Sequence, residues 1–536
     1  MPQQSAELRR ISRRRNDRRG LKHIALVSLA VVQLLACSEN ADPPAGQGGQ
    51  GGSAAASGGS QASGGAGTGT GGAATGGGPV IEDPIPGFRA DYFFQYRELA
   101  HSTIEEKIEH VWTGENTEPA PGVGGDHFSV RYSAQLRVDE AGTYGFATVA
   151  DDGVRLWIDE RLVIDDWRPH AAERHEGVIE LTPGEVSLRL EYYEDDYGAE
   201  ASLFWTRPGN EESILDASFV TAIDGSAVAP KPPYRNAVIP SDRPDPGVLA
   251  DGNPPVYYMV STGGRFHIRK SYDLVFWEDT NAFVLAEGKP SWAANGGRNW
   301  APELHKVGDR YVAYYTSVNG ANVLSIGAAS ADAPTGPFTD LGAPLVEHAQ
   351  GVIDASFFED SDGKRYLTYK IDGNAHGQAT PIYLRELSAD GLSFAPGSTQ
   401  VEILRNDSTT WEGGVVEGQW IVKRGDTYFL FYSGNVYDQR YRTGVARSSS
   451  LTGPYQKHGA PILTNNDDWV GPGHGSVVPA GDALYFIYHA WVENGSGGRV
   501  SESGRHVLVD KIDFIDNWPV ISGGSPSHTL QPWPGY

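Results

Sequence analysis

From Gly87 onward the chain consists of short runs in which apolar and polar residues alternate, separated by turn sequences such as Glu140-Ala141-Gly142 and Thr182-Pro183-Gly184. No stretch keeps the 3.6-residue period of an amphipathic helix, and a period of two is typical of strands with one buried face. The pattern therefore predicts a β-sandwich over residues 85–225. The runs that carry this prediction are Phe88–Phe94, His127–Val138, Thr143–Ala150, Val154–Val163, Glu185–Glu194 and Glu200–Thr206.

A second pattern begins beyond the proline-rich segment Ala229–Pro233 and consists of an aromatic strand built around tyrosine. Its copies are VYYM, YVAYYT, RYLTYK, YFLFYSG and LYFIYHAW, which start at residues 256, 311, 365, 428 and 484. Successive starts are 55, 54, 63 and 56 residues apart. Five copies at this spacing predict a five-bladed β-propeller of four-stranded blades over residues 235–536. The expected fold class is thus all-β, with the propeller preceded by the β-sandwich.

The first 84 residues have a different composition. Residues 1–23 are rich in arginine, and Ile24–Ala36 is a thirteen-residue apolar run, too short to span a bilayer but suited to a signal peptide. Residues 38–80 contain no aromatic residue, leucine, isoleucine, lysine or arginine. We expect a signal peptide over residues 1–36 and a disordered Gly/Ser/Ala-rich linker over residues 37–84.

The signal region ends in Leu34-Leu35-Ala36-Cys37, which resembles the lipobox of bacterial lipoproteins. The resemblance implies acylation of Cys37, and Ser38 in the next position favours the outer membrane. The protein would then be secreted to the cell envelope and held at the membrane by its lipid anchor only. An ordinary secretory signal with an incidental cysteine is the alternative.

Charge and cysteine content narrow the possible functions. The net charge of -25 argues against a nucleic-acid partner, because phosphate binding needs a basic face. Cys37 is the single cysteine, so neither an intramolecular disulfide nor a thiolate metal site is possible.

Three acidic residues interrupt apolar or small-residue segments of the predicted propeller. They are Asp245 in RPDPGV, Asp354 in GVIDASFF and Glu417 in GVVEGQW. A carboxylate in such a setting is unfavourable unless it has partners or a role. Because each lies on a different blade, the three could converge on the axial channel.

The strings around these acids, together with NWAPELHKVGDRYVAYYT, GPGHGSVV and DKIDFIDNWP, resemble glycoside hydrolase family 43 over residues 237–522. The resemblance implies an enzyme that cleaves arabinose- or xylose-containing glycans without a cofactor for the chemistry. It assigns Asp245 as general base, Glu417 as general acid, and Asp354 as the residue that orients the acid and raises its pKa. An inverting mechanism fits this trio. The sequence departs from the family at Gln419, where proline is frequent.

The same resemblance suggests three further site residues. His474 matches a histidine beside a central calcium ion in many relatives. Arg505 matches an arginine that faces the sugar, although a surface salt bridge is equally compatible with its sequence context. Trp300 matches a position near the sugar pocket, where it could stack on the ring.

The first β domain resembles the protective-antigen-type lectin-like domain, on the strings TYGFATVADDGVRLWIDERLVIDDW and LRLEYYEDDYGAEASLFW. In sugar-binding members paired aspartates hold a calcium ion, and Asp151 and Asp152 match that pair. Calcium prefers hard oxygen ligands, so this assignment is chemically sound. A tight Asp-Asp-Gly turn with solvated charges is the alternative.

The sequence is compatible with four hypotheses for the function of the protein. The leading hypothesis is an exo-acting α-L-arabinofuranosidase or β-xylosidase that acts on polysaccharide or oligosaccharide. An endo-arabinanase is the second. A catalytically silent glycan-binding lipoprotein and a propeller scaffold for protein partners are weaker, because neither needs all three acids.

Overall fold

The computed structural model describes residues 84–112, 117–195, 198–225, 229–294 and 298–535. The expected signal peptide, Cys37 and nearly all of the expected linker lie outside these residues. The described chain is all-β, as predicted, and only three short 3-10 helices interrupt the strands. None of the helices in this part of the chain is long and apolar enough to span a bilayer.

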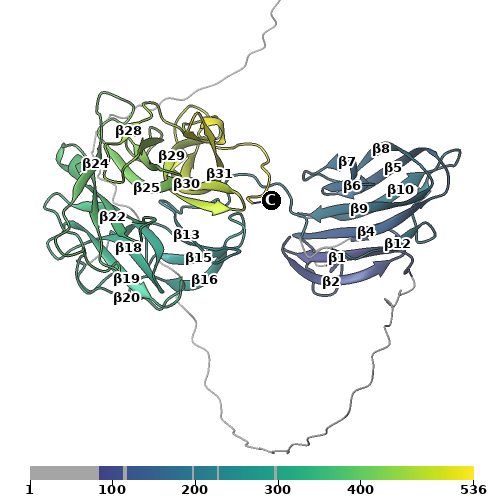
Figure 1. The fold of residues 1–536 in the computed structure, drawn as a ribbon, viewed down its shortest axis with the longest axis horizontal. Helices are drawn as coiled ribbons and strands as arrows, with labels where there is room; N and C mark the ends of the chain where they lie inside the picture. The colour runs from purple at the N-terminus through teal and green to yellow at the C-terminus, as the bar shows by residue number, and fades with distance from the viewer. Residues whose placement is uncertain (1–83, 113–116, 196–197, 226–228, 295–297, 536) are drawn as a thin grey trace, which may run out of the picture. The chain divides into compact units, whose positions relative to one another are not determined.

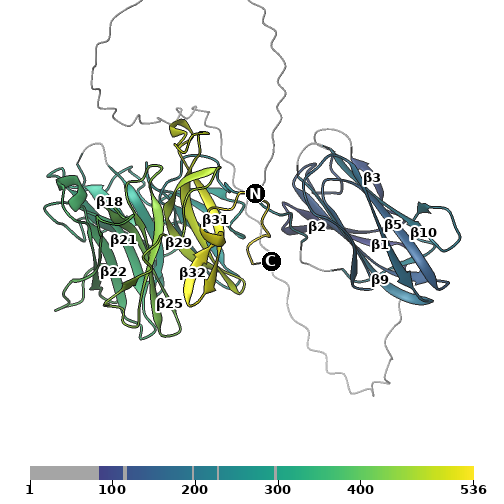
Figure 2. The same ribbon diagram turned by 90° about the horizontal axis from the view of Figure 1, so that it is seen from above.

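Two antiparallel sheets form the N-terminal domain (Figure 2). One has the order β2-β1-β4-β9-β6-β7 with β12 paired to β4, and the other has the order β11-β10-β5-β8 with β3 paired to β10. Their inward side chains, among them Leu156, Leu190, Leu203 and Trp205, form one buried core. The strands are β1 (Phe88–Phe94), β2 (Glu98–Glu105), β3 (Glu109–Trp112), β4 (Phe128–Val138), β5 (Gly142–Asp151), β6 (Val154–Ile158), β7 (Arg161–Asp166), β8 (Glu173–Leu181), β9 (Gly184–Glu194), β10 (Ala199–Thr206), β11 (Ser213–Ile214) and β12 (Val220–Ala222).

The segment Val154–Val163 differs from the prediction of one strand. It contains the hairpin of β6 and β7, with Asp159 at φ 53° and Glu160 at φ 58° in the turn. Two consecutive residues with positive φ form the tight turn that matches the twist of paired strands. The alternation continues across this turn, so the pattern alone did not reveal it.

Five four-stranded antiparallel sheets form the C-terminal domain, which confirms the five-bladed propeller (Figure 1). Blade 1 is β13 (Gly247–Asp251), β14 (Val256–Val260), β15 (His267–Ser271) and β16 (Glu278–Phe283). Blade 2 is β17 (Trp300–Val307), β18 (Arg310–Val318), β19 (Leu324–Ala331) and β20 (Thr339–Asp340). Blade 3 is β21 (Val352–Glu359), β22 (Arg365–Ile371), β23 (Pro381–Glu386) and β24 (Val401–Arg405). Blade 4 is β25 (Val416–Arg424), β26 (Thr427–Gly434), β27 (Arg442–Ser448) and β28 (Gln456–Lys457). Blade 5 is β29 (Trp469–Ala480), β30 (Ala483–Val492), β31 (Arg505–Ile515) and β32 (Trp518–Ile521).

The first strand of each blade faces the propeller axis. Neighbouring first strands contact one another around a closed ring, β13 to β17, β21, β25, β29 and back to β13. The five aromatic repeats are the second strands, β14, β18, β22, β26 and β30. The repeat therefore located one strand in every blade, and the strand before it borders the channel.

Candidate active site

In every blade one residue with positive φ lies inside the first strand or, in blade 1, two residues before it; β29 also contains Gly471 at φ 65°, which is not counted here. We call these five the axial positions. In four of the five blades the register between first and second strands shifts beside the axial position. Such a bulge bends a strand and redirects its side chains. The axial residues are Asp245 (φ 56°), Ala301 (φ 38°), Asp354 (φ 56°), Gly418 (φ 58°) and His474 (φ 45°).

The backbone amide of an axial residue donates a hydrogen bond to a side chain at the end of the second strand in the preceding blade. This side chain lies three residues after the aromatic repeat in blade 1, closes the repeat in blade 2, and is next to last in the repeat of blade 4 and third from last in that of blade 5. The four bonds are Ala301 N to Thr262 Oγ1 (2.7 Å), Asp354 N to Thr316 Oγ1 (3.3 Å), His474 N to Ser433 Oγ (2.8 Å) and Asp245 N to His489 Nδ1 (3.1 Å).

Blade 3 breaks this rule because Lys370 occupies the corresponding place, and an ammonium group cannot accept a hydrogen bond. Lys370 Nζ instead donates to Glu417 Oε2 at 2.8 Å and to Asp372 Oδ1 at 3.1 Å. The freed amide of Gly418 donates to Asp354 Oδ2 at 3.1 Å. The exception in the repeat thus connects Glu417 and Asp354, two of the three predicted catalytic acids.

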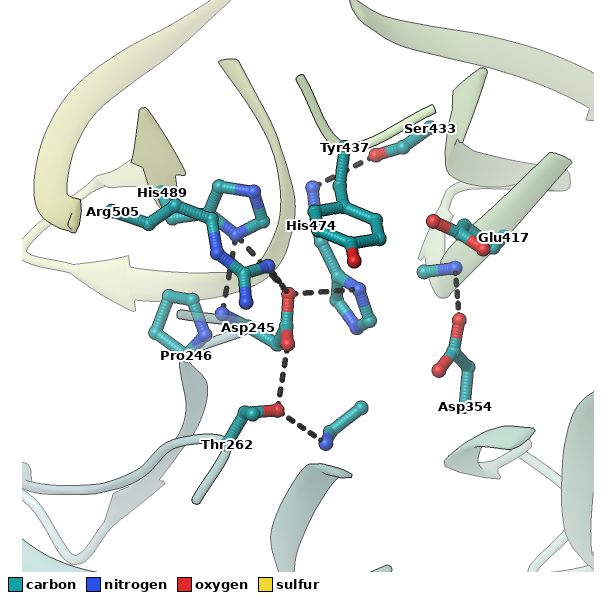
Figure 3. Close-up of polar contacts among 12 residues, drawn as sticks. Asp245, Pro246, Thr262, Asp354, Glu417, Ser433, Tyr437, His474, His489 and Arg505 are labelled. Carbon is teal, nitrogen blue, oxygen red and sulfur yellow. Dashed lines mark hydrogen bonds and ion pairs between the residues drawn. The ribbon is translucent and has the colours of Figure 1, made fainter. Parts of the chain in front are cut away.

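Asp245 is buried among donors (Figure 3). Its Oδ1 lies 3.0 Å from Arg505 Nη1 and 3.4 Å from His474 Nδ1, and its Oδ2 accepts a hydrogen bond from Thr262 Oγ1 at 2.6 Å. Burial raises the pKa of this carboxyl, but the charges of Arg505 and His474 outweigh burial and hold the pKa well below 3.8. Asp245 is therefore an ionised carboxylate, as a general base must be.

His489 completes the surroundings of Asp245 as a neutral ring. Its Nδ1 accepts the amide proton of Asp245, so in the neutral form the ring proton sits on Nε2. Burial lowers the pKa of His489 to about 4. His474 is the opposite case, because Asp245, Asp354 and Glu417 together outweigh its burial and raise its pKa.

Glu417 differs from the expectation. Burial raises its pKa, but the Lys370 ammonium and the hydrogen bond from Tyr441 (OH to Oε1, 2.9 Å) bring the pKa of Glu417 below 4.5. Burial raises the pKa of Asp354 to about 6. In the free protein the proton of this carboxyl pair therefore rests on Asp354 rather than on Glu417. The segment around Glu417 does not reveal this, because Lys370 belongs to another blade.

The remaining residues singled out in the sequence lie at or near the axial positions. Arg505 is only 15% exposed and pairs with Asp245, so it is not a surface salt bridge. Trp300 is half-buried and packs against a small apolar cluster that contains Val318, Leu324 and Ile353, next to axial Ala301. Its contact with sugar remains a prediction. Gln419 donates to the backbone carbonyl of Asp354, which helps to hold that residue.

The calcium predicted beside His474, with water as its other ligands, remains a prediction. The groups of three or more His, Cys, Asp or Glu ligands found there both lie in the N-terminal domain. Calcium takes six to eight oxygen ligands, and His474 offers a nitrogen that faces Asp245. We therefore assign no chemical step to a metal at this place.

One of those groups is Asp151, Asp152 and Glu194, which fits calcium better. Asp152 is buried and accepts hydrogen bonds from the amides of His170 (2.7 Å) and Asp195 (2.8 Å). Glu194 Oε1 is buried without a hydrogen-bond partner, and burial raises the pKa of Glu194 to about 9. A hard cation would satisfy this orphaned oxygen. Sequence reasoning missed Glu194, although it closes the string LRLEYYE.

Several residues of the catalytic network were also missed: Thr262, Lys370, Tyr441 and His489. Lys370 closes an aromatic repeat, His489 lies near the end of another, and Thr262 lies three residues after a third, where a polar residue resembles an ordinary strand end. Comparison of the five repeats would have singled out Lys370, because it is the only cation among Thr262, Thr316, Lys370, Ser433 and His489.

Gly418 provides a test of the axial geometry. A Cβ at this position would lie 2.8 Å from Cγ of His474. We expect Gly418→Ala to lose about 1–3 kcal/mol of unfolding free energy beyond the strain of an alanine at positive φ, and to lower kcat by displacing His474. Gly425→Ala is the matched control, since Gly425 has the same φ of 58° with nothing within 4 Å. Equal destabilisation of the two variants by urea unfolding would contradict the close approach.

Comparison with known proteins identifies the families that the two domains match. Residues 234–519, more than half of the chain, match the model of glycosyl hydrolases family 43, and residues 86–218 match that of the PA14 domain. A protein of Xylanibacter ruminicola named "Putative beta-xylosidase" is 28% identical over 286 residues, which are 52% of this chain and 49% of that protein. The chain thus spans about half the length of this relative.

Two further similarities concern the propeller. An Aspergillus oryzae protein named "Probable arabinan endo-1,5-alpha-L-arabinosidase A" is 29% identical over 304 residues, which are 52% of this chain and 90% of that protein. The crystal structure of a thermostable family-43 glycoside hydrolase aligns with a TM-score of 0.50 and 29% identity, over 56% of this chain and 99% of that one. On the match over residues 234–519, which reaches all five blades, the chain belongs to glycosyl hydrolases family 43 and carries a PA14 domain ahead of the propeller.

Proposed function

We propose that the propeller hydrolyses glycosidic bonds of arabinose- or xylose-containing glycans and releases single sugars from chain ends, as an α-L-arabinofuranosidase or a β-xylosidase. One observation carries the proposal. The channel holds a carboxylate kept ionised by Arg505 and His474, and a separate carboxyl pair, Glu417 and Asp354, that retains a proton to higher pH. Two carboxyl groups with opposed environments are the acid and base that glycoside hydrolysis requires.

In the proposed reaction Asp245 accepts a proton from a water molecule as its oxygen attacks the anomeric carbon. Glu417 donates a proton to the leaving oxygen as the glycosidic bond breaks. Asp354 supplies that proton to the pair and is held toward Glu417 by the Gly418 amide. The sugar is released with inverted configuration, the proton on Asp245 returns to solvent, and the Glu417–Asp354 pair takes up a proton from solvent in place of the one given to the leaving group.

The test is hydrolysis of p-nitrophenyl α-L-arabinofuranoside and β-D-xyloside, beside release of sugars from linear arabinan. Nitrophenol release supports an exo-acting glycosidase, and NMR of the first anomer formed tests inversion. Oligosaccharides from arabinan without nitrophenol would indicate the endo-acting alternative. No product from any of the three would favour a glycan-binding protein without catalysis.

The pH dependence follows from the two carboxyl environments. Because the pKa of Asp245 is well below 3.8, the base is ionised throughout the mildly acidic range. The acid pair must hold one proton, which in the free protein rests on Asp354 with a pKa of about 6, so kcat/KM should fall as the pH rises through about 6 and be highest in acid. We expect Lys370→Met to raise the pKa of Glu417 and move this alkaline limb to higher pH. At one pH on the limb, the fraction of its own maximal kcat/KM that the variant retains should be about tenfold larger than the fraction that the wild type retains. A limb that stays in place or moves to lower pH would remove Lys370 from this role.

We also propose that Cys37 is acylated and anchors the protein in the outer membrane. The motif around Cys37 supports this, and labelling of growing cells with alkynyl palmitate tests it. Label in the wild type and none in Cys37→Ser is the expected result. Label in both, or in neither, would contradict the anchor.

We further propose that Asp151, Asp152 and Glu194 bind calcium in the N-terminal domain and that sugar binding there depends on it. Isothermal titration of calcium into the wild type and into Asp152→Asn tests the site. We expect loss of binding in the variant. Equal affinity would leave the alternative of a turn with solvated charges.

A further inference from the structure

A second cluster in the N-terminal domain has no role in the functions above. It consists of Asp166 at the end of β7, His170 in the following loop and His175 in β8. His170 Nε2 lies 2.6 Å and His175 Nε2 lies 2.7 Å from the same oxygen, Asp166 Oδ2. These three atoms are buried, and none has a hydrogen-bond partner of acceptable geometry among the described residues. The side chain of His170 is only 4% exposed.

The other polar atoms of Asp166 and His170 are already engaged. His170 Nδ1 donates to the backbone carbonyl of Ala171 at 2.7 Å, which leaves a lone pair on Nε2 in the neutral ring. Arg168 Nε lies 2.9 Å from Asp166 Oδ1, which leaves Oδ2 for the two histidines. Metal-binding histidines commonly donate their second ring nitrogen to a backbone carbonyl in this way.

We propose that Asp166, His170 and His175 bind one divalent transition metal ion of the zinc class. Two imidazole nitrogens and one carboxylate oxygen are ligands that zinc prefers, whereas calcium prefers oxygen ligands alone. Next to the cluster, His175 is 29% exposed and Glu173 Oε2, which accepts a hydrogen bond from Arg168 Nη2 at 2.6 Å, lies 3.5 Å from His175 Nε2. Water or Glu173 completes a tetrahedral site there.

An ion cluster without metal is the rival explanation. If both rings were protonated, their Nε2–H groups would be expected to point at Asp166 Oδ2, yet neither makes a hydrogen bond to it despite the short distances. The lone pair of an imidazole nitrogen points in the same direction as its N–H would. Neither Nε2 lone pair is therefore directed at Asp166 Oδ2. Ligands that surround one ion have this arrangement.

The proposed ion would fix the loop between β7 and β8. The backbone amide of His170 in this loop donates to Asp152 Oδ1 at 2.7 Å. A metal on the side chain of His170 therefore holds the amide that orients Asp152. The site is structural in character and supports the neighbouring acidic group.

The experiment titrates zinc into the full chain, purified without a histidine tag and in excess calcium so that oxygen-only sites are filled. His175→Gln and Asp166→Asn are the test variants. His110→Gln is the matched control, because His110 Nε2 lies 2.7 Å from a single carboxylate, that of Glu105, in the same domain. We expect one zinc per chain in the wild type and in His110→Gln. In the two test variants the affinity for zinc should be weaker by roughly 100-fold or more.

Two measurements keep the test independent of folding defects. Zinc should raise the thermal unfolding temperature of the wild type and the control but not of the test variants. Cobalt bound to the wild type should show the intense visible absorption of a tetrahedral site. Absence of a tight zinc equivalent in the wild type, or equal affinity in His175→Gln and the wild type, would overturn the proposal.

Discussion

Asp245→Asn is expected to lower kcat/KM by roughly three to four orders of magnitude, because the amide cannot accept the proton of the attacking water. The surroundings make Asp245 the base: Arg505 at 3.0 Å and the Thr262 hydroxyl at 2.6 Å both favour the ionised form. Loss of the base affects attack of water and not departure of the leaving group. The deficit should therefore be equally large for aryl glycosides and for unactivated oligosaccharides.

The measurement is kcat/KM across a series of aryl glycosides with leaving groups of different basicity. Asp251→Asn is the control, since Asp251 ends β13, the strand that follows Asp245 in the chain, and its Oδ1 lies 2.8 Å from Lys306 Nζ. The control should retain activity. An Asp245→Asn variant that recovers on good leaving groups would mean that Asp245 assists departure, and its role as base would be wrong.

Glu417→Gln has the second large effect, and its signature is different. A good leaving group such as nitrophenol departs without a proton, whereas a sugar hydroxyl requires one. We expect a loss of about two to four orders of magnitude in kcat/KM on oligosaccharides and a much smaller loss on activated aryl glycosides. The circular dichroism spectrum should remain unchanged, since glutamine preserves the shape of the side chain.

Asp354→Asn is the comparison that separates the two members of the pair. The pKa of Asp354 is raised to about 6 while that of Glu417 is lowered, so either carboxyl could deliver the proton. If Asp354→Asn shows the dependence on leaving group and Glu417→Gln does not, the roles of the two residues are exchanged. A uniform loss in Asp354→Asn supports its role in orienting and supplying Glu417.

The architecture was accessible from sequence because it repeats. A period of two and five aromatic copies each reflect local burial on one strand, and the copies proved to be the second strands of the blades. The short strands β3, β11 and β12 were not predicted, because two to four residues carry too little alternation. The longer strands β2 and β8 were missed as well, because most of their side chains are polar or exposed. The hairpin at Asp159 and Glu160 was missed because the pattern continues through its turn.

The three acids were accessible because each interrupts an apolar segment, which identifies a carboxylate in need of partners. Their electrostatics were not. The pKa of Glu417 depends on Lys370, 47 positions earlier in the chain, and that of Asp245 depends on Arg505, 260 positions later. The first contact arises from packing of blade 3 against blade 4 and the second from closure of the ring of blades, and neither is visible in the local sequence around the acids.

The axial positions have a further consequence. Five blades bring the same backbone bend to the same ring, and the side chains there are carboxylate, methyl, carboxylate, hydrogen and imidazole in order around it. A nearly symmetric ring of blades thereby becomes chemically asymmetric, with the proton acceptor and the proton donor on different blades. The residues at a few axial positions thus decide the chemistry, and exchanging them would change the reaction while leaving the strand pairing of the blades intact.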